Sequence, residues 1–186
     1  MRTQYYTAAS LDGFLATDDH SIDWLFPLAD LNATGYPEFF AQVGALAMGS
    51  ATYEWILRNV ATVAAQTGSR WPYTQPTWVY TTRRLPTVPG ADLRFVQGPV
   101  PPVHAAMVAA AGQRNRWVVG GGELAGQFYD AGLLDELIIQ VGSVTLGRGK
   151  PLFPRQVLSP TLRLRGARMI GEGMAELRYS VECSPR

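Results

Sequence analysis

Short apolar runs, separated by glycine, proline and polar turns, recur along the chain and predict alternating strands and helices. The runs with the length and composition of buried strands cover residues 5–9, 45–48, 77–81, 93–96 and 117–119. Apolar residues at helical spacing predict helices at 36–43, 52–60 and 104–112, and a further one that begins after residue 122. Thr52 is the predicted cap of the second helix, and residues 61–76 are predicted to form a loop.

The pattern changes towards the carboxyl end, where strands follow one another without helices between them. Residues 137–146 predict a longer strand, and residues 162–170 and 175–183 flank Gly171 and Gly173, which predicts a hairpin. This order is typical of an α/β domain with a mostly parallel sheet and antiparallel strands added at its end. No linker or repeat divides the sequence, so residues 1–186 are expected to form a single domain.

Three consecutive glycines, Gly120, Gly121 and Gly122, stand between the predicted strand at 117–119 and the helix behind it. The first turn of a helix has free N–H groups and the positive end of the helix dipole, which suit a phosphate. The other interpretation is a tight turn with close packing and no ligand. Gly120, Gly122 and Ala125 satisfy the dinucleotide fingerprint, but the next strand lacks the expected ribose-binding carboxylate. Both interpretations of the turn stay open, whereas a standard Rossmann domain is not favoured.

Composition and charge narrow the classes of function. The chain has 186 residues, of which 47% are hydrophobic and 17% charged, as expected for a globular protein. A net charge of +1 gives no electrostatic basis for binding nucleic acid or an anionic membrane. Because no run of 18 apolar residues and no signal-peptide pattern is present, the expected location is cytoplasmic. Cys183 is the single cysteine, which excludes an internal disulfide. Neither His20 nor His104 has a nearby Cys/His/carboxylate cluster with metal-ligand spacing, so no metal site is predicted.

Seven segments carry a family resemblance when their order and spacing are taken together. They are AASLDGFLA at 8–16, IDWL at 22–25, MGSATYE at 48–54, VYTTR at 79–83, VVGGGELAGQF at 118–128, LLDELIIQV at 133–141 and LGRGKPLF at 146–153. The chain resembles the dihydrofolate reductase superfamily, in the branch similar to the reductase (C-terminal) domain of bifunctional riboflavin-biosynthesis proteins. The resemblance implies a dihydrofolate-reductase-like three-layer α/β/α fold with a mostly parallel central sheet and a C-terminal antiparallel hairpin.

The same resemblance implies NADPH as the cofactor and assigns its parts to four segments. The nicotinamide is expected beside Ala9, Leu15 and Ala16, and the pyrophosphate and adenosine beside Gly49, Ser50, Ala51 and Thr52. The adenosine ribose and its 2′-phosphate are expected at Thr81, Thr82 and Arg83. The pyrophosphate and nicotinamide ribose are expected at Val119, Gly120, Gly121, Gly122, Glu123 and Leu124. Ser50 stands where the family usually has arginine, so Arg83 or Arg84 is expected to supply the cationic contact; the alternative is that both are ordinary surface arginines.

Five residues are candidates for the substrate side, and each has a structural alternative. Asp12 of the SLDG segment is implied to lie by the substrate and to bind it or supply a proton; the alternative is turn chemistry. Trp24 and Tyr53 are candidate walls of the substrate site, or core aromatics. Asp30 and Glu38 are possible counterparts of the pterin-binding carboxylate of true dihydrofolate reductases, or a helix cap and a solvated helix residue. Neither aligns cleanly, which argues against a true dihydrofolate reductase.

The function expected from the resemblance is hydride transfer from NADPH to a small heterocyclic substrate of pteridine or pyrimidine type. The alternative is a non-catalytic nucleotide-binding or structural homodimer of the same fold. A homodimer is the expected assembly, by resemblance to the riboflavin-type branch, and neither nucleic acid nor a membrane is an expected partner.

Overall fold

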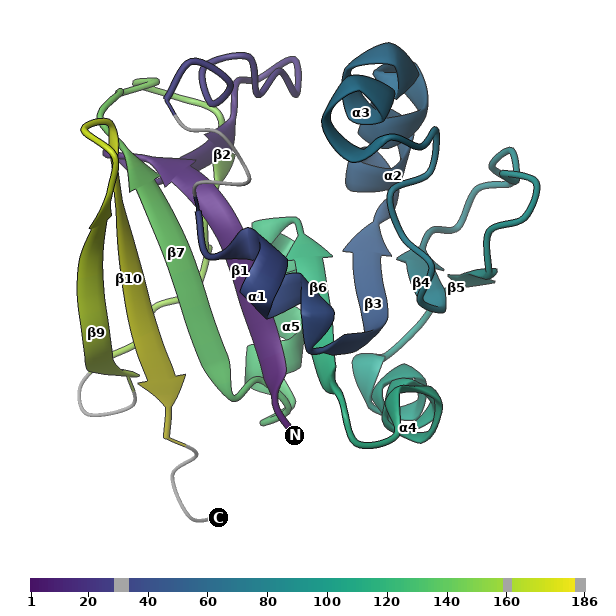
Figure 1. Ribbon diagram of the computed structural model, residues 1–186. Coiled ribbons are helices and arrows are strands. Elements are labelled where there is room, and N and C mark those ends of the chain that lie inside the picture. Colours follow the sequence, from purple (N-terminus) through teal and green to yellow (C-terminus); the bar gives the residue numbers. More distant parts are fainter. Residues whose placement is uncertain (29–33, 159–161, 183–186) are drawn as a thin grey trace.

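Figure 1 shows a central sheet with helices packed around it. The structure is a computed structural model that describes residues 1–28, 34–158 and 162–182. Within these residues, eight strands form one sheet, in the order β5 (Leu93–Val96), β4 (Thr77–Tyr80), β3 (Val43–Gly49), β6 (Asn115–Gly120), β1 (Thr3–Ser10), β7 (Glu136–Gly142), β10 (Met174–Val181) and β9 (Leu162–Ile170). The first six run parallel, and β10 and β9 are antiparallel. Strands β2 (Phe14–Ala16) and β8 (Lys150–Pro151) form a separate pair.

The helices divide between the two faces of the sheet. One face carries α1 (Tyr36–Ala41), α2 (Ser50–Arg58) and α3 (Val60–Thr67), and the other carries α4 (Val100–Ala111) and α5 (Gly122–Asp130). Side chains alternate along β3, so Leu46 and Met48 pack with the first group, whereas Ala45 and Ala47 pack with the second. The expected α/β class, with a mostly parallel sheet and a terminal antiparallel hairpin, is confirmed.

Aromatic packing holds α1 on the sheet, although this helix has only six residues. Phe39 stacks on Tyr6 with ring centroids 4.3 Å apart and meets Trp117 edge to face at 5.3 Å. The Trp117 indole donates a hydrogen bond to the Tyr6 carbonyl oxygen at 3.0 Å. Burial of each such side chain stabilises the fold by roughly 1.5–3 kcal/mol. A helix too short to be stable alone is therefore fixed by tertiary contacts.

The chain changes faces at the carboxyl ends of three neighbouring strands. β3 leads into α2 and β1 leads towards α1 on one face, whereas β6 leads into α5 on the other. In open α/β sheets such a switch leaves a crevice at the carboxyl edge, where ligands bind. Met48 pairs with Gly120, so the predicted turns after β3 and β6 lie side by side at this edge.

Several boundaries differ from the sequence prediction. Residues 61–67, predicted as loop, belong to α3, which ends at Gly68 in the left-handed conformation that glycine suits. Helix α4 begins at Val100 rather than at residue 104, because prolines are compatible with the first helical turn. Thr52 is not a cap, since the N-cap of α2 is Gly49. The strand predicted to reach residue 146 ends at Gly142, as the chain turns there towards β8.

Two residues of the sequence analysis lie outside the described part of the chain. Asp30 falls within residues 29–33, and Cys183 falls within 183–186. Within the described ranges, no helix is long and apolar enough to cross a membrane.

Candidate functional site

The three consecutive glycines have different surroundings. A methyl group on Gly120 would lie 3.1 Å from Oγ1 of Thr52, and one on Gly122 would overlap the carbonyl oxygens of residues 151–152. A methyl group on Gly121 would meet nothing within 4 Å. The peptide bond between Gly120 and Gly121 is cis. Close packing therefore accounts for Gly120 and Gly122, and the open space at Gly121 is where a ligand can approach the backbone.

Two helices begin at this edge with N-termini that no side chain caps. The N-cap residues are Gly49 for α2 and Gly121 for α5, and neither helix has a side-chain hydrogen bond at its cap. Each helix has nine residues, and the first turn of α2 contains no acidic residue. Free N–H groups and two positive dipole ends are thus available to a dianion such as a pyrophosphate. The residues present fit the phosphate portion of a dinucleotide.

The segment after β4 forms the third predicted contact. The Arg83 amide donates a hydrogen bond to Oγ1 of Thr81 at 3.0 Å, which turns the chain at the end of the strand. Thr82 and Arg83 are exposed. The Arg83 guanidinium donates two hydrogen bonds to the Glu54 carboxylate of α2, at 2.9 and 2.6 Å. These bonds lower the pKa of Glu54, so the carboxylate is ionised at neutral pH. Arg83, the residue predicted to bind the 2′-phosphate, is therefore already paired with an anionic side chain.

Three further residues predicted to hold the cofactor sit in different environments. The Glu123 carboxylate accepts hydrogen bonds of 2.8 and 2.9 Å from the Arg155 guanidinium, so its side chain is turned towards residue 155. Leu124 is buried among the apolar residues between the sheet and α4 and α5. Val119 is half-buried and packs on the opposite face of the sheet, beside α1 and α2. At Glu123 and Leu124, only main-chain groups remain available to a ligand.

Two of the three residues predicted to wall the nicotinamide are buried. Ala9 is fully buried and faces the core beneath α5, so it can contribute only main-chain atoms. Its neighbour Ala8, which the sequence analysis missed, points to the other face and is half-buried. Leu15 is half-buried, and Ala16 is buried where it pairs with Lys150 of β8. Of the three residues predicted for this wall, Leu15 is the one whose side chain is partly exposed.

Asp12 joins two loops at the carboxyl edge. Its carboxylate accepts a hydrogen bond from the Ser10 hydroxyl at 2.6 Å and from the backbone amides of Leu146, at 3.1 Å, and Gly147, at 2.7 Å. The Ser10 hydrogen bond and these amides lower the pKa of Asp12 below its usual range. An ionised carboxylate with these partners positions the loop after β7 against the loop after β1, and it holds no proton to donate at neutral pH.

Replacing Asp12 with asparagine is expected to loosen the loop after β7. An amide offers one acceptor oxygen without charge, where the carboxylate offers two charged ones. Amide hydrogen exchange at Leu146 and Gly147 should accelerate by about tenfold, because local opening of the loop costs less free energy. Mass spectrometry of the exchanged peptides measures this, with Asp23→Asn as the matched control on an exposed aspartate. Unchanged exchange in Asp12→Asn would show that the loop is held by other contacts.

Tyr53 does not fit its predicted contact with the substrate. Its side chain is fully buried, donates a hydrogen bond to the Pro86 carbonyl oxygen at 2.5 Å, and packs edge to face on Trp71 and Phe95. This part of the prediction is wrong, because the inward face of α2 buries Tyr53 against β4 and β5. The helix periodicity of residues 52–60 contained that signal.

Trp24 and Glu38 lie at different ends of the sheet. Trp24 is half-buried and packs over Gly142 at the end of β7, beside the carboxyl edge. Its indole nitrogen is buried and has no hydrogen-bond partner among the described residues. Glu38 instead lines a cavity of about 440 Å³ with Gln4 and Arg168, between α1 and the β9–β10 hairpin. Gln4 is six residues before the end of β1, roughly 20 Å away along the strand, so Glu38 is not brought to the glycine turns.

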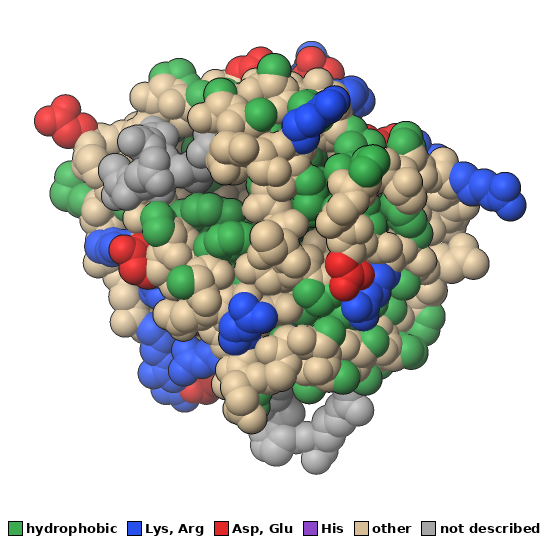
Figure 2. Space-filling model, turned by 45° about the vertical axis from the view of Figure 1, so that its right-hand side comes forward, with side chains coloured by type: hydrophobic (Ala, Val, Ile, Leu, Met, Phe, Trp, Pro, Cys, Tyr) green, Lys and Arg blue, Asp and Glu red, His purple; other side chains and the backbone are tan. Residues whose placement is uncertain are grey.

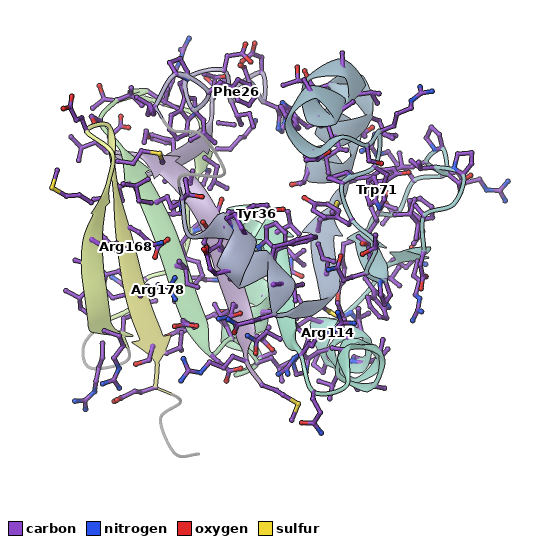
Figure 3. All side chains as sticks on the ribbon, in the orientation of Figure 1. Phe26, Tyr36, Trp71, Arg114, Arg168 and Arg178 are labelled. Atoms are coloured by element: carbon purple, nitrogen blue, oxygen red, sulfur yellow. The ribbon has the colours of Figure 1, made fainter. Side chains whose placement is uncertain are left out.

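The segment after β2 contacts α2, a contact that was not predicted from the sequence. Phe26 and Trp55 of α2 have ring centroids 6.4 Å apart, and Figure 3 shows Phe26 above the carboxyl edge of the sheet. His20 lies close enough to Lys150 and Arg58 that burial and these two cations lower the pKa of its imidazole. The apolar residues within an otherwise polar loop were the available signal, since an exposed loop rarely keeps such a cluster.

Comparisons with known proteins identify the family of this chain. Residues 57–175 match the RibD C-terminal domain family. Uncharacterized protein YwjB of Bacillus subtilis (strain 168) is 32% identical over 178 residues, which cover 96% of this chain and 97% of YwjB.

Solved structures extend the likeness over the whole fold. A putative riboflavin biosynthesis protein from Shewanella sp. PV-4 has a TM-score of 0.79 at 24% identity, with 98% of this chain and 100% of that one covered. The dihydrofolate reductase of Enterococcus faecalis, solved with NADP(H), has a TM-score of 0.63 at 15% identity, with 98% and 97% covered. The fold is therefore that of dihydrofolate reductase, and the chain belongs to the RibD C-terminal domain family.

Proposed function

We propose that the protein is an NADPH-dependent reductase that transfers a hydride to a small heterocyclic substrate of pteridine or pyrimidine type. The observation that carries the proposal is the meeting of two uncapped helix N-termini with the open space at Gly121, at the switch point of the sheet. Membership of the RibD C-terminal domain family supports a reductase. The similar fold of a dihydrofolate reductase solved with NADP(H) supports the cofactor.

The protein's own residues would bind, orient and exclude water, and the nicotinamide would supply the hydride. The main-chain amides at the starts of α2 and α5 would hold the pyrophosphate. Asp12 would keep the loops after β1 and β7 together beside the reacting rings. Because the Asp12 carboxylate is ionised, the proton that accompanies the hydride would come through water.

Titration of the purified protein with NADPH tests the proposal. Quenching of tryptophan fluorescence should saturate below about 1 mM cofactor, the upper end of ordinary cofactor and substrate affinities. Oxidation of NADPH should then be measured with a panel of pteridines, pyrimidines and quinone-like acceptors. Absence of saturable binding near millimolar NADPH would overturn the proposal.

The second candidate is a non-catalytic nucleotide-binding or structural homodimer of the same fold. Ser50 favours it, because the family usually places an arginine there and a cationic contact to the cofactor is missing. Binding of NADPH without oxidation by any acceptor in the panel would support this candidate. Sedimentation at the single-chain mass of 20.3 kDa, independent of concentration, would rule out the homodimer.

A further inference from the structure

The ion pair between Arg83 and Glu54 stands where the cofactor's adenosine ribose is expected. Nη1 of Arg83 donates to Oε1 of Glu54 at 2.9 Å, and Nη2 donates to Oε2 at 2.6 Å. The side chains are 57% and 31% exposed, so the pair borders solvent and is open to a ligand. The bidentate geometry uses the Nη1/Nη2 edge of the guanidinium, which is one of the two edges that can bind a phosphate.

The chemistry of the ribose decides what this pair can recognise. In dinucleotide sites, a carboxylate accepts a hydrogen bond from the free 2′-hydroxyl of NADH, and an arginine binds the 2′-phosphate of NADPH. Here Glu54 is the carboxylate and Arg83 is the arginine, and the two side chains are paired with each other. A 2′-phosphate must displace the Glu54 carboxylate or lie beside its negative charge, whereas a 2′-hydroxyl can donate to it.

Neighbouring cationic groups help to keep Glu54 charged. Arg58 and His20 are the other titratable groups that act on Glu54, and both lower its pKa. Arg84, which follows Arg83 in the sequence, is exposed. Ser50 provides no charge at the start of α2. Arg83 and Arg84 are therefore the cations next to β4 that a 2′-phosphate can reach, and of these Arg83 is paired with Glu54.

We propose that Glu54 sets the choice of cofactor, by pairing with Arg83 so that the site accepts NADH as well as NADPH. This inference rests on the proposed function, because it needs a nicotinamide dinucleotide in the site. Glu54 is a specificity-determining residue: it weakens the contact with the 2′-phosphate and offers an acceptor to the 2′-hydroxyl.

Isothermal titration with the oxidised nucleotides NADP⁺ and NAD⁺ tests the inference without turnover. In the wild type, the two dissociation constants should differ by less than about tenfold. Glu54→Gln should tighten NADP⁺ about tenfold and leave NAD⁺ unchanged or weaker, because Arg83 is released. The double variant Glu54→Gln with Arg83→Gln should lose that gain. The matched control is Glu172→Gln, the same change on an exposed residue in the turn between β9 and β10, which should alter neither constant.

Two measurements would overturn the inference while leaving the proposed function standing. One is a wild-type preference for NADP⁺ above about a hundredfold, which needs a full cationic contact with the phosphate. The other is a loss of NADP⁺ affinity above about tenfold in Arg83→Gln alone, which would show that Arg83 is already free for the phosphate. Failure of both nucleotides to bind the wild type would instead overturn the proposed function, and this inference with it.

Discussion

Replacing Gly122 with alanine is expected to destabilise the protein by about 2–3 kcal/mol, within the range for overpacked sites. The added methyl group would overlap the backbone carbonyl oxygens of residues 151–152, and backbone gives way less readily than a flexible side chain. These residues are also tied elsewhere, because the Leu152 amide donates to the Gly13 carbonyl oxygen at 2.9 Å. Urea unfolding followed by circular dichroism measures the loss as a lower midpoint at unchanged slope.

Gly121→Ala is the matched control, one residue away with nothing within 4 Å of the added methyl group. Its free energy of unfolding should stay within about 0.5 kcal/mol of the wild type. Its NADPH affinity should nevertheless fall by about tenfold or more, because the methyl group would fill the space left to the ligand. Equal destabilisation by the two variants would contradict the packing argument. Unchanged NADPH binding in Gly121→Ala would contradict the assignment of the phosphate to this turn.

Glu176→Gln is expected to cost about 2–3 kcal/mol of stability, less than a fully buried ion pair because both arginines are half-exposed. The Glu176 carboxylate of β10 is fully buried and accepts hydrogen bonds from Nε of Arg168, at 3.0 Å, and Nε of Arg178, at 2.9 Å. Gln140 donates a further one at 3.3 Å. Figure 3 shows the two arginines side by side over this end of the sheet. An amide in place of the carboxylate would remove the charge with which both guanidiniums pair.

The contribution of Glu176 to the free energy of unfolding should decrease as the pH falls. Burial alone would raise the pKa of this carboxyl, but hydrogen bonds from Arg168, Arg178 and Gln140 lower it below its usual range. A lowered folded-state pKa gives stability that is complete above the unfolded-state pKa of about 4.3 and is lost as pH falls through the folded-state value. The wild type and Glu176→Gln should therefore differ most near pH 7 and converge in acid.

Glu38→Gln is the control for these two measurements, because Glu38 is an exposed glutamate that lines the same cavity as Arg168 and Arg178. Its unfolding free energy should stay within about 0.5 kcal/mol of the wild type at every pH. A difference between wild type and Glu176→Gln that grows as the pH falls would contradict the assignment of the carboxylate as the stabilising group.

Charge on the surface is mixed in sign. Figure 2 shows basic and acidic side chains distributed together over one face of the molecule, and the net charge of the whole chain is +1. Arginines pair with carboxylates in several places, such as Arg155 with Glu123 and Asp130. Binding of an anionic ligand to this protein therefore depends on local groups, namely helix N-termini and guanidiniums that are not paired with a carboxylate. The electrostatic field of the whole protein contributes little.

The sequence by itself determined the features that depend on local chemistry. Strand and helix periodicity indicated the parallel sheet and the terminal hairpin, and the glycines at 49 and 120–122 marked the turns that meet at the carboxyl edge. Helix α3 was missed because Gly68, Pro72 and Pro76 led to the interpretation of residues 61–76 as a loop, whereas the helix precedes Gly68 and ends there. Local signals suffice where a residue's own conformational preference decides the outcome.

The tertiary structure alone decided which side chains at this edge remain free to act. Asp12 meets amides 134 and 135 residues later in the chain, and Arg83 meets Glu54 across 29 residues, and no local pattern encodes either contact. Tyr53, one residue before Glu54, points inward because α2 packs its apolar face on the sheet. The close approach of residues 151–152 explains Gly122, which in the sequence was indistinguishable from Gly121. Such contacts follow from how helices and loops dock on the sheet, so the same residue types serve as ligands or as packing according to their place in the fold.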